Sequence, residues 1–180
     1  MTITLRAWQP DDAANLARII NNPNILNNLR DDLPYPYTTA DATDYIQMAL
    51  AADPAMQYAR AIVANGAVVG SLGIFRQQNI HRLTAELGYY VAEPWWGKGV
   101  CTKAVSDACA AIFATTDIVR IFAEPFSANK ASCRVLEKAG FLREGTLRKN
   151  AIKHGALLDM EMYALVKKHL ASKQTPYTLP

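Results

Sequence analysis

The sequence predicts an α+β domain in which strands and helices follow one another in mixed order. Three observations support this. The chain has 180 residues, 51% of them hydrophobic, which suits one domain with a full core. Hydrophobic periodicity gives a strand, two helices, three strands and a helix in succession. The dipeptide Asn65-Gly66, which fits a two-residue hairpin turn, separates two of these strands. We expect the domain to span residues 1–168, with a frayed tail at residues 169–180.

The predicted N-terminal part contains one short strand and two helices. Residues 3–8 alternate as a strand, and a helix with apolar residues at helical spacing begins near Pro10. A possible helical turn and an irregular loop follow. A second helix then begins with Thr39 or Asp41 as its N-cap and ends before Pro54.

Three strands come next, and the third contains an acidic residue. The hairpin strands span residues 58–64 and 67–75, and the third strand spans residues 83–91. Glu86 lies in this third strand, which otherwise has the composition of a buried one. A carboxylate there is costly unless it is paired or takes part in chemistry, and the residues alone favour a salt-bridged or edge glutamate.

A glycine-containing turn joins the third strand to a helix. Gly97 and Gly99 flank Lys98, and the helix that follows places apolar residues on one stripe. Helix starts have free N–H groups that suit phosphate, and glycines let a ligand approach them closely. An ordinary strand-to-helix turn explains the glycines equally well. The spacing does not match a Walker loop or the G-x-G-x-x-G fingerprint.

The C-terminal part is predicted to hold a strand at residues 118–124, a helix at residues 129–139 and two final strands. Gly140 suits the C-cap of this helix. Ser132 falls on its apolar stripe, where a core serine bonded to a carbonyl is the simpler interpretation. The final strands span residues 141–150 and 156–166.

Composition excludes several classes of protein. Lys and Arg outnumber Asp and Glu by only 19 to 16, which does not indicate a nucleic-acid partner. The three cysteines form no C-x-x-C pair, which favours a reduced, cytoplasmic protein. We expect no membrane span, because no apolar stretch is long enough, and no metal site, because no ligand cluster is present.

Two stretches resemble the acetyl-CoA motifs of the GNAT acetyltransferases. The first is Pro94-Trp95-Trp96-Gly97-Lys98-Gly99, which matches Gln/Arg-x-x-Gly-x-Gly/Ala except that proline stands first. The second is Asn129-x-x-Ser132, ahead of Gly140-Phe141. With the preceding E-L-G-Y-Y-V, the first stretch resembles the branch that includes ribosomal-protein N-terminal acetyltransferases and small-amine acetyltransferases.

This resemblance implies a GNAT fold with acetyl-CoA as co-substrate. The implied sheet is mixed, mostly antiparallel, six- to seven-stranded and flanked by helices. It is splayed between the fourth and fifth strands, where acetyl-CoA would lie. The cofactor-binding residues implied are Tyr90, Val91, Ala92, Gly97, Lys98, Gly99, Val100, Cys101, Thr102 and Asn129.

The resemblance also implies the chemistry. Glu86, directly or through water, would deprotonate an amine that attacks the thioester, and Ser132 would protonate the leaving thiolate. Many members of the family use tyrosine as this acid. The backbone N–H near Val91 would polarise the carbonyl. The acceptor is expected to be a small amine or a protein N-terminus, for example that of a ribosomal protein, and both monomer and homodimer remain open.

The irregular loop at residues 31–37 has two interpretations. It is either a surface connection whose tyrosines cover the core, or one wall of the acceptor pocket, formed by Asp31, Tyr35 and Tyr37. The second is favoured, because binding residues gather on loops and these side chains suit a cationic amine.

Two other functions remain as alternatives. The chain could be a non-catalytic regulator that binds acyl-CoA. It could also be a ribosome- or RNA-associated protein, since residues 130–153 hold seven Lys and Arg against two Glu.

Overall fold

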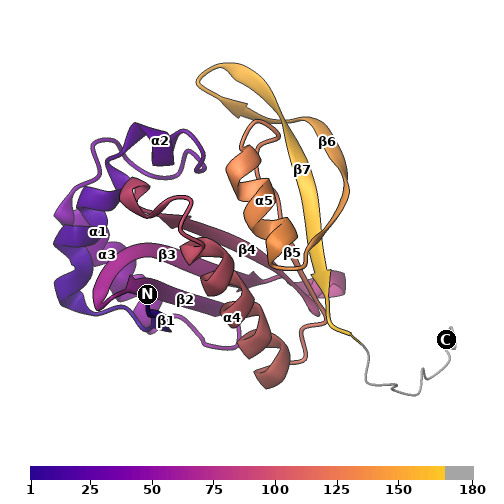
Figure 1. The fold of residues 1–180 in the computed structure, drawn as a ribbon, viewed down its shortest axis with the longest axis horizontal. Coiled ribbons are helices and arrows are strands. Elements are labelled where there is room, and N and C mark those ends of the chain that lie inside the picture. Colours follow the sequence, from indigo (N-terminus) through magenta and orange to yellow (C-terminus); the bar gives the residue numbers. More distant parts are fainter. Residues whose placement is uncertain (169–180) are drawn as a thin grey trace, which may run out of the picture.

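A seven-stranded sheet runs through the computed structural model, which describes residues 1–168 (Figure 1). The predicted tail at residues 169–180 lies outside the described part. The strand order is β1-β2-β3-β4-β5-β7-β6. The strands are β1 (Ile3–Arg6), β2 (Gln57–Ala64), β3 (Ala67–Arg76), β4 (Thr84–Val91), β5 (Arg120–Ala123), β6 (Leu142–Lys153) and β7 (Ala156–Val166).

The sheet is mixed and opens on one side of its middle. All neighbouring strands pair antiparallel except β4 and β5, which are parallel. That parallel pairing covers only residues 84–86 of β4 and 120–122 of β5, although β4 continues to Val91. The predicted mixed, mostly antiparallel α+β sheet and the splay between its fourth and fifth strands are therefore confirmed.

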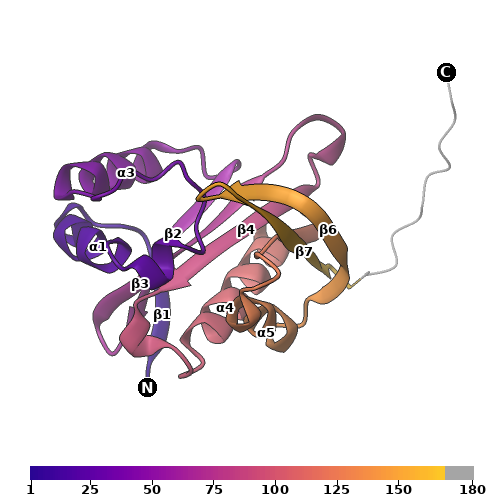
Figure 2. The same cartoon turned by 90° about the horizontal axis from the view of Figure 1, so that it is seen from above.

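Helices cover both faces of the sheet. Figure 2 shows α1 and α3 on one face and α4 and α5 on the other. The helices are α1 (Ala13–Ile20), α2 (Pro23–Leu26), α3 (Thr39–Ala51), α4 (Val100–Thr115) and α5 (Lys130–Lys138), with short 3₁₀ turns at Pro10–Asp12, Asn79–His81 and Glu93–Trp95.

Each face has its own hydrophobic core, as expected when side chains alternate across a sheet. The larger core joins α4 and α5 to the central strands through fully buried side chains such as Leu72, Val105 and Leu136. The smaller core joins α1 and α3 through Leu16 and Ile46. Of the apolar residues at helical spacing, those of α1 and most of those of α4 are buried, whereas Leu50 of α3 is 50% exposed.

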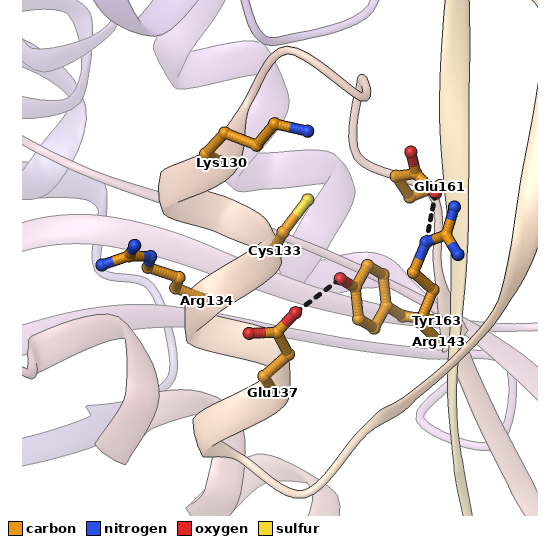
Figure 3. A pocket seen from close by; sticks show the side chains of 7 residues that line it. All are labelled: Lys130, Cys133, Arg134, Glu137, Arg143, Glu161 and Tyr163. Carbon is orange, nitrogen blue, oxygen red and sulfur yellow. Dashed lines mark hydrogen bonds and ion pairs between the residues drawn. The ribbon is translucent and has the colours of Figure 1, made fainter.

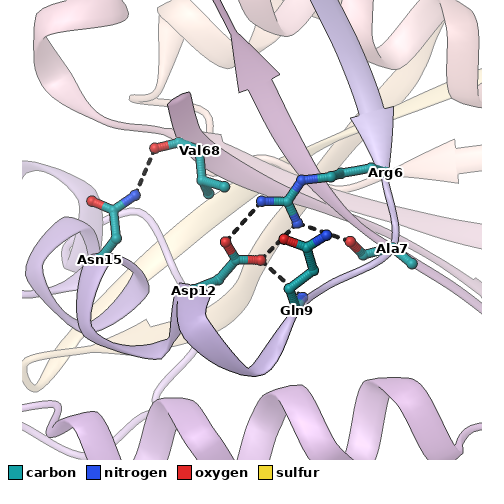
Figure 4. Close-up of polar contacts among 6 residues, drawn as sticks. All are labelled: Arg6, Ala7, Gln9, Asp12, Asn15 and Val68. Atoms are coloured by element: carbon teal, nitrogen blue, oxygen red, sulfur yellow. Dashed lines mark hydrogen bonds and ion pairs between the residues drawn. The ribbon is translucent and has the colours of Figure 1, made fainter. Parts of the chain in front are cut away.

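An ion pair fixes the N-terminal strand to the start of α1 (Figure 4). The guanidinium of Arg6 donates to both carboxylate oxygens of Asp12, at 2.7 and 2.8 Å. The backbone N–H of Gln9 donates to the same carboxylate at 2.9 Å. Asp12 is only 8% exposed, and these three bonds compensate the burial of its charge.

Several predicted boundaries differ from the structure, and three of them have a local cause. The N-cap of α3 is Thr38, not Thr39 or Asp41, and Asp41 completes its capping box from the third helical position. Strand β1 ends at Arg6, where the side chain turns to Asp12. Strand β6 extends to Lys153, because register shifts let it bend and continue beside β7. The predicted turn at Asn65 and Gly66 is confirmed, with positive φ at both residues.

Candidate active site

A cleft of about 1020 Å³ opens where β4 and β5 separate. It is lined by the segment around α2, by β4, by the loop before α4, by the end of β5 and by α5. Its volume is that of a site for a large ligand. The two sequence motifs, which lie about 30 residues apart in the chain, therefore meet in one cavity.

The glycine turn forms one end of this cleft. Gly97 and Gly99 have φ of 71° and 77°, and a Cβ built on either meets no atom within 4 Å. Helix α4 begins directly after Gly99, whose carbonyl accepts the first helical bond from the N–H of Lys103 at 3.1 Å. The N–H groups of residues 100–102 precede that bond and have no partner within the helix. The turn therefore presents backbone donors at a helix start, without side chains in front of them.

Two further residues of the turn have specific surroundings. The ammonium of Lys98 lies 5.4 Å from the centre of the Trp95 ring. Cys101 lines the cleft, and burial raises the pKa of its thiol to about 12. At neutral pH this thiol is protonated, so it does not act as a nucleophile.

The backbone N–H and C=O groups of β4 point alternately toward β3 and toward the side of β5. The N–H of Ala92 donates to the carbonyl of Val69 on β3 at 2.7 Å. The carbonyl of Leu83 accepts on the opposite side, from Val119 before β5, at 2.9 Å. Because backbone groups alternate along a strand, Tyr90 and Ala92 direct theirs to β3, while Tyr89 and Val91 direct theirs to the gap.

This alternation limits which predicted backbone contacts can be made. Of Tyr90, Val91 and Ala92, only Val91 turns its N–H toward the gap, and its carbonyl accepts from the indole of Trp96 at 2.8 Å. The Tyr90 side chain also lines the cleft, and it packs against the smaller hydrophobic core.

Ser132 faces the cleft from the first turn of α5 and contacts Tyr89. Asn129 caps this helix, since its side-chain oxygen accepts from the N–H of Ser132 at 3.1 Å. The hydroxyls of Ser132 and Tyr89 are 2.9 Å apart, and Tyr89 also donates to the Ser132 carbonyl at 3.1 Å. Burial raises the pKa of Tyr89 above its ordinary value. Nothing in the local pattern singles out Tyr89 beyond its place in the alternating strand.

Glu86 stands at the point where the two strands part. It is the last β4 residue paired with β5, opposite Phe122, and its side chain is 25% exposed. The guanidinium of Arg30, from the segment after α2, pairs with this carboxylate. Glu86 thus has the cationic partner that a half-buried carboxylate requires.

A second carboxylate, Glu124, lines the same cleft just beyond the end of β5. Burial raises its pKa, the charge of Glu86 raises it further, and Arg30 lowers it. Sequence reasoning missed Glu124, because nothing in the local pattern shows that it lies across the gap from Glu86.

The predicted acceptor residues of the loop lie elsewhere. Asp31 accepts from Lys153 at 2.5 Å, and Tyr35 is 70% exposed. Tyr37 is buried in the smaller core and donates to the carbonyl of Asp41 at 3.2 Å. None of the three is among the described residues that line the cleft. The segment contributes others instead: Asn24, Ile25, Asn28, Leu29, Arg30, Asp32 and Leu33.

A smaller cavity of about 360 Å³ lies between α5 and the final hairpin (Figure 3). Both of its carboxylates are hydrogen-bonded: Glu161 accepts from Arg143 at 2.6 Å, and Glu137 accepts from the hydroxyl of Tyr163 at 2.8 Å. Burial raises the pKa of Cys133, which keeps its thiol protonated at neutral pH. This cavity lacks an activated nucleophile.

The described residues contain neither a cluster of metal ligands nor a membrane-spanning helix. Within residues 1–168, no group of three or more His, Cys, Asp or Glu side chains is arranged to hold a metal ion. In the same part of the chain, no helix is long and apolar enough to span a bilayer.

Known proteins are similar to this chain in sequence or in architecture. The uncharacterized N-acetyltransferase p20 of Bacillus licheniformis is 28% identical over 173 residues, which cover 94% of this chain and 95% of p20. Ribosomal-protein-S5-alanine acetyltransferase from Vibrio fischeri has a similar fold, with a TM-score of 0.83, 19% identity and coverage of 96% of this chain and 97% of that one. Spermidine N-acetyltransferase from Vibrio cholerae, solved with CoA and spermine, has a TM-score of 0.76 at 22% identity, covering 92% and 95%. Residues 2–142 match the acetyltransferase (GNAT) domain, and the chain therefore belongs to the GNAT acetyltransferases.

Proposed function

We propose that this acetyltransferase moves the acetyl group of acetyl-CoA to a primary amine by direct attack within a ternary complex. The observation that carries the proposal is the cleft between β4 and β5. It has free helix N–H donors at one end, the Ser132 hydroxyl on one wall and the Glu86 carboxylate on the other.

Acetyl-CoA would lie along this cleft. Its pyrophosphate would accept from backbone N–H groups of the turn from Gly97 to Thr102, with the positive charge of Lys98 nearby. The pantetheine arm would pair with the backbone of β4 that faces the gap, at Tyr89, which leaves the N–H of Val91 for the thioester carbonyl. The side-chain oxygen of Asn129 already caps α5, which leaves its NH₂ group free to donate to this arm.

The reaction would take place between Glu86 and Ser132. The amine nitrogen attacks the thioester carbonyl, a C–N bond forms and the C–S bond breaks. Glu86 accepts the proton that the amine loses, directly or through water. Ser132 donates a proton to the leaving thiolate and is hydrogen-bonded to Tyr89, from which the proton can be replaced. The N–H of Val91 would polarise the carbonyl.

The acceptor class in this proposal is a cationic amine, either a small amine or the N-terminus of a protein such as a ribosomal protein. Two enzymes of similar structure are named for these two kinds of acceptor, one for a ribosomal protein and one for spermidine. The carboxylates Asp32, Glu86 and Glu124 line the cleft, which suits an acceptor that arrives as an ammonium ion.

The proposed setting is the reducing cytoplasm. All three cysteines of the chain are free, and two of them, Cys109 and Cys133, are buried.

The run of basic residues at 130–153 that suggested RNA binding is partly neutralised, because Arg143 pairs with Glu161 and Lys153 pairs with Asp31.

The test is release of CoA from acetyl-CoA in the presence of a panel of alkylamines, polyamines and N-terminal peptides. Turnover that depends on both substrates, with the acetylated amine identified by mass spectrometry, supports the proposal. Tight binding of acetyl-CoA without turnover for any amine would instead indicate a non-catalytic acyl-CoA-binding protein.

A further inference from the structure

Glu86, the carboxylate proposed as the base, forms an ion pair within the protein in this structure. Arg30 pairs with Glu86, and both residues line the cleft. The side chain of Arg30 is 62% exposed, so solvent reaches it and it can rotate away. A base that is held by an internal guanidinium has to be released before it can accept a proton from a substrate.

The backbone that carries Arg30 is held in position. Lys153, at the end of β6, donates to the carbonyl of Leu29 at 2.8 Å and to the carboxylate of Asp31 at 2.5 Å. The side chain of Lys153 is only 9% exposed. The next residue of the hairpin, His154, contacts the side-chain oxygen of Asn27 at 3.1 Å.

Figure 1 shows that this hairpin of β6 and β7 reaches the side of the molecule where α2 lies. The residues on both sides of Arg30 are therefore held by hydrogen bonds, while the Arg30 side chain itself is largely exposed.

A second carboxylate faces the same space. Glu86 lies beside Phe122 in the parallel register, and Glu124 follows two residues later, so both project from the same face of the sheet. The neighbours Ile121 and Ala123 are buried on the opposite face, under α4 and α5. Arg30 is thus a cation located beside two carboxylates on either side of the gap.

We propose that Arg30 determines acceptor specificity: its guanidinium occupies the place of the acceptor's ammonium group between Glu86 and Glu124, and the acceptor must displace it. The inference rests on the proposed function, because it concerns the amine site of that reaction. An ammonium ion compensates both carboxylates after Arg30 leaves. A neutral amine of the same shape does not, and it leaves the ion pair intact.

Cyclohexylamine and aniline provide a matched pair of probes. Both are primary amines on a six-membered ring, but at neutral pH the first is an ammonium ion and the second is neutral. Their affinities are measured by calorimetry on the full chain in the presence of CoA, so that no turnover occurs. The variants are Arg30→Gln and Glu124→Gln. Arg18→Gln is the control, since Arg18 is exposed on α1 and outside the cleft.

Arg30→Gln is expected to bind cyclohexylamine about 2- to 5-fold more tightly, which is the range for loss of a competing exposed ion pair. Aniline binding should not change, and neither should any affinity in Arg18→Gln. Glu124→Gln should weaken cyclohexylamine binding in both the wild-type and the Arg30→Gln background. In the wild type, the Nε–H NMR signal of Arg30 should move when cyclohexylamine is added and stay in place with aniline.

Unchanged affinity for cyclohexylamine in Arg30→Gln would overturn the proposal. Weaker binding would also overturn it, and would show that Arg30 itself contacts the acceptor. The outcome is separate from that of the proposed function. If no amine is acetylated but Arg30→Gln still binds the ammonium probe more tightly, the proposed activity is wrong. The competition between Arg30 and the ammonium group for the two carboxylates is then still supported.

Discussion

The hydroxyl groups of Tyr89 and Ser132 lie 2.9 Å apart and connect β4 to the first turn of α5 across the splayed gap. This contact gives the serine a specific partner inside the cleft. Burial raises the pKa of Tyr89, so its hydroxyl is protonated at neutral pH and has a hydrogen to share with Ser132. The pair suits delivery of a proton to a leaving thiolate.

Ser132→Ala should lower kcat while leaving the affinity for acetyl-CoA largely unchanged, because in the proposed mechanism the hydroxyl acts on the leaving group. Tyr89→Phe should lower kcat by a smaller factor. The double variant should lose less than the product of the two single effects, since both residues serve one step. Steady-state kinetics and calorimetry measure these quantities. Ser106→Ala, on α4 and outside the cleft, is the control, and full activity in Ser132→Ala would remove the serine from the mechanism.

Gly97→Val and Gly99→Val should weaken acetyl-CoA binding more than they lower the free energy of unfolding. Both glycines have positive φ, and a side chain on either would stand where the pyrophosphate approaches. Gly66→Val is the matched control. Gly66 also has positive φ and open space around it, but it lies in the hairpin turn after β2. Equal losses of cofactor affinity in all three variants would show that backbone strain alone is responsible.

Glu86→Gln should lower kcat/KM by about 10²- to 10⁴-fold, the usual contribution of a general base. The amide keeps the size of the side chain but accepts no proton. The control is Glu144→Gln, because Glu144 also pairs with an arginine, Arg120, but outside the cleft. If Glu86→Gln retains full activity, ordered water or substrate positioning replaces the carboxylate as base.

Charge reversal of both Asp31 and Asp32 to lysine should raise KM for the best cationic amine, and the effect should shrink as salt is added. The structure separates the two residues, since Asp32 lines the cleft and Asp31 pairs with Lys153. Asp32→Asn alone should therefore raise KM without lowering the melting temperature. Asp44→Asn, exposed on α3, is the control. An unchanged KM, or a best acceptor that is anionic, would refute an acidic entrance.

Asp12→Asn should lower the free energy of unfolding by about 1.5–3 kcal/mol near neutral pH, as expected for loss of charged hydrogen bonds in a buried site. The hydrogen bonds from Arg6 lower the pKa of Asp12 below its unfolded value of 3.8. Its contribution is therefore complete above that value and is lost as the pH falls through the native pKa. Urea titrations should show the gap between wild type and Asp12→Asn closing below pH 3.8. A gap that stays constant with pH would contradict the ion pair, and Asp11→Asn provides the exposed control.

The sequence alone determined the features that arise between near neighbours in the chain. Period-two and helical spacing predicted the strands and helices, and Asn65 and Gly66 predicted the hairpin turn. Gly97 and Gly99 predicted the start of α4, and Asn129 predicted the start of α5. These features depend on backbone geometry over a few residues, which local residue types set.

The tertiary structure decided which side chains from distant parts of the chain contact one another. Arg30 and Glu86 are 56 residues apart in the chain, Tyr89 and Ser132 are 43 apart, and Asp31 and Lys153 are 122 apart. It also placed Tyr37 in the core and Glu124 opposite Glu86. Such contacts depend on strand order, on the splay and on helix packing, and no local pattern encodes a pairing between side chains so far apart.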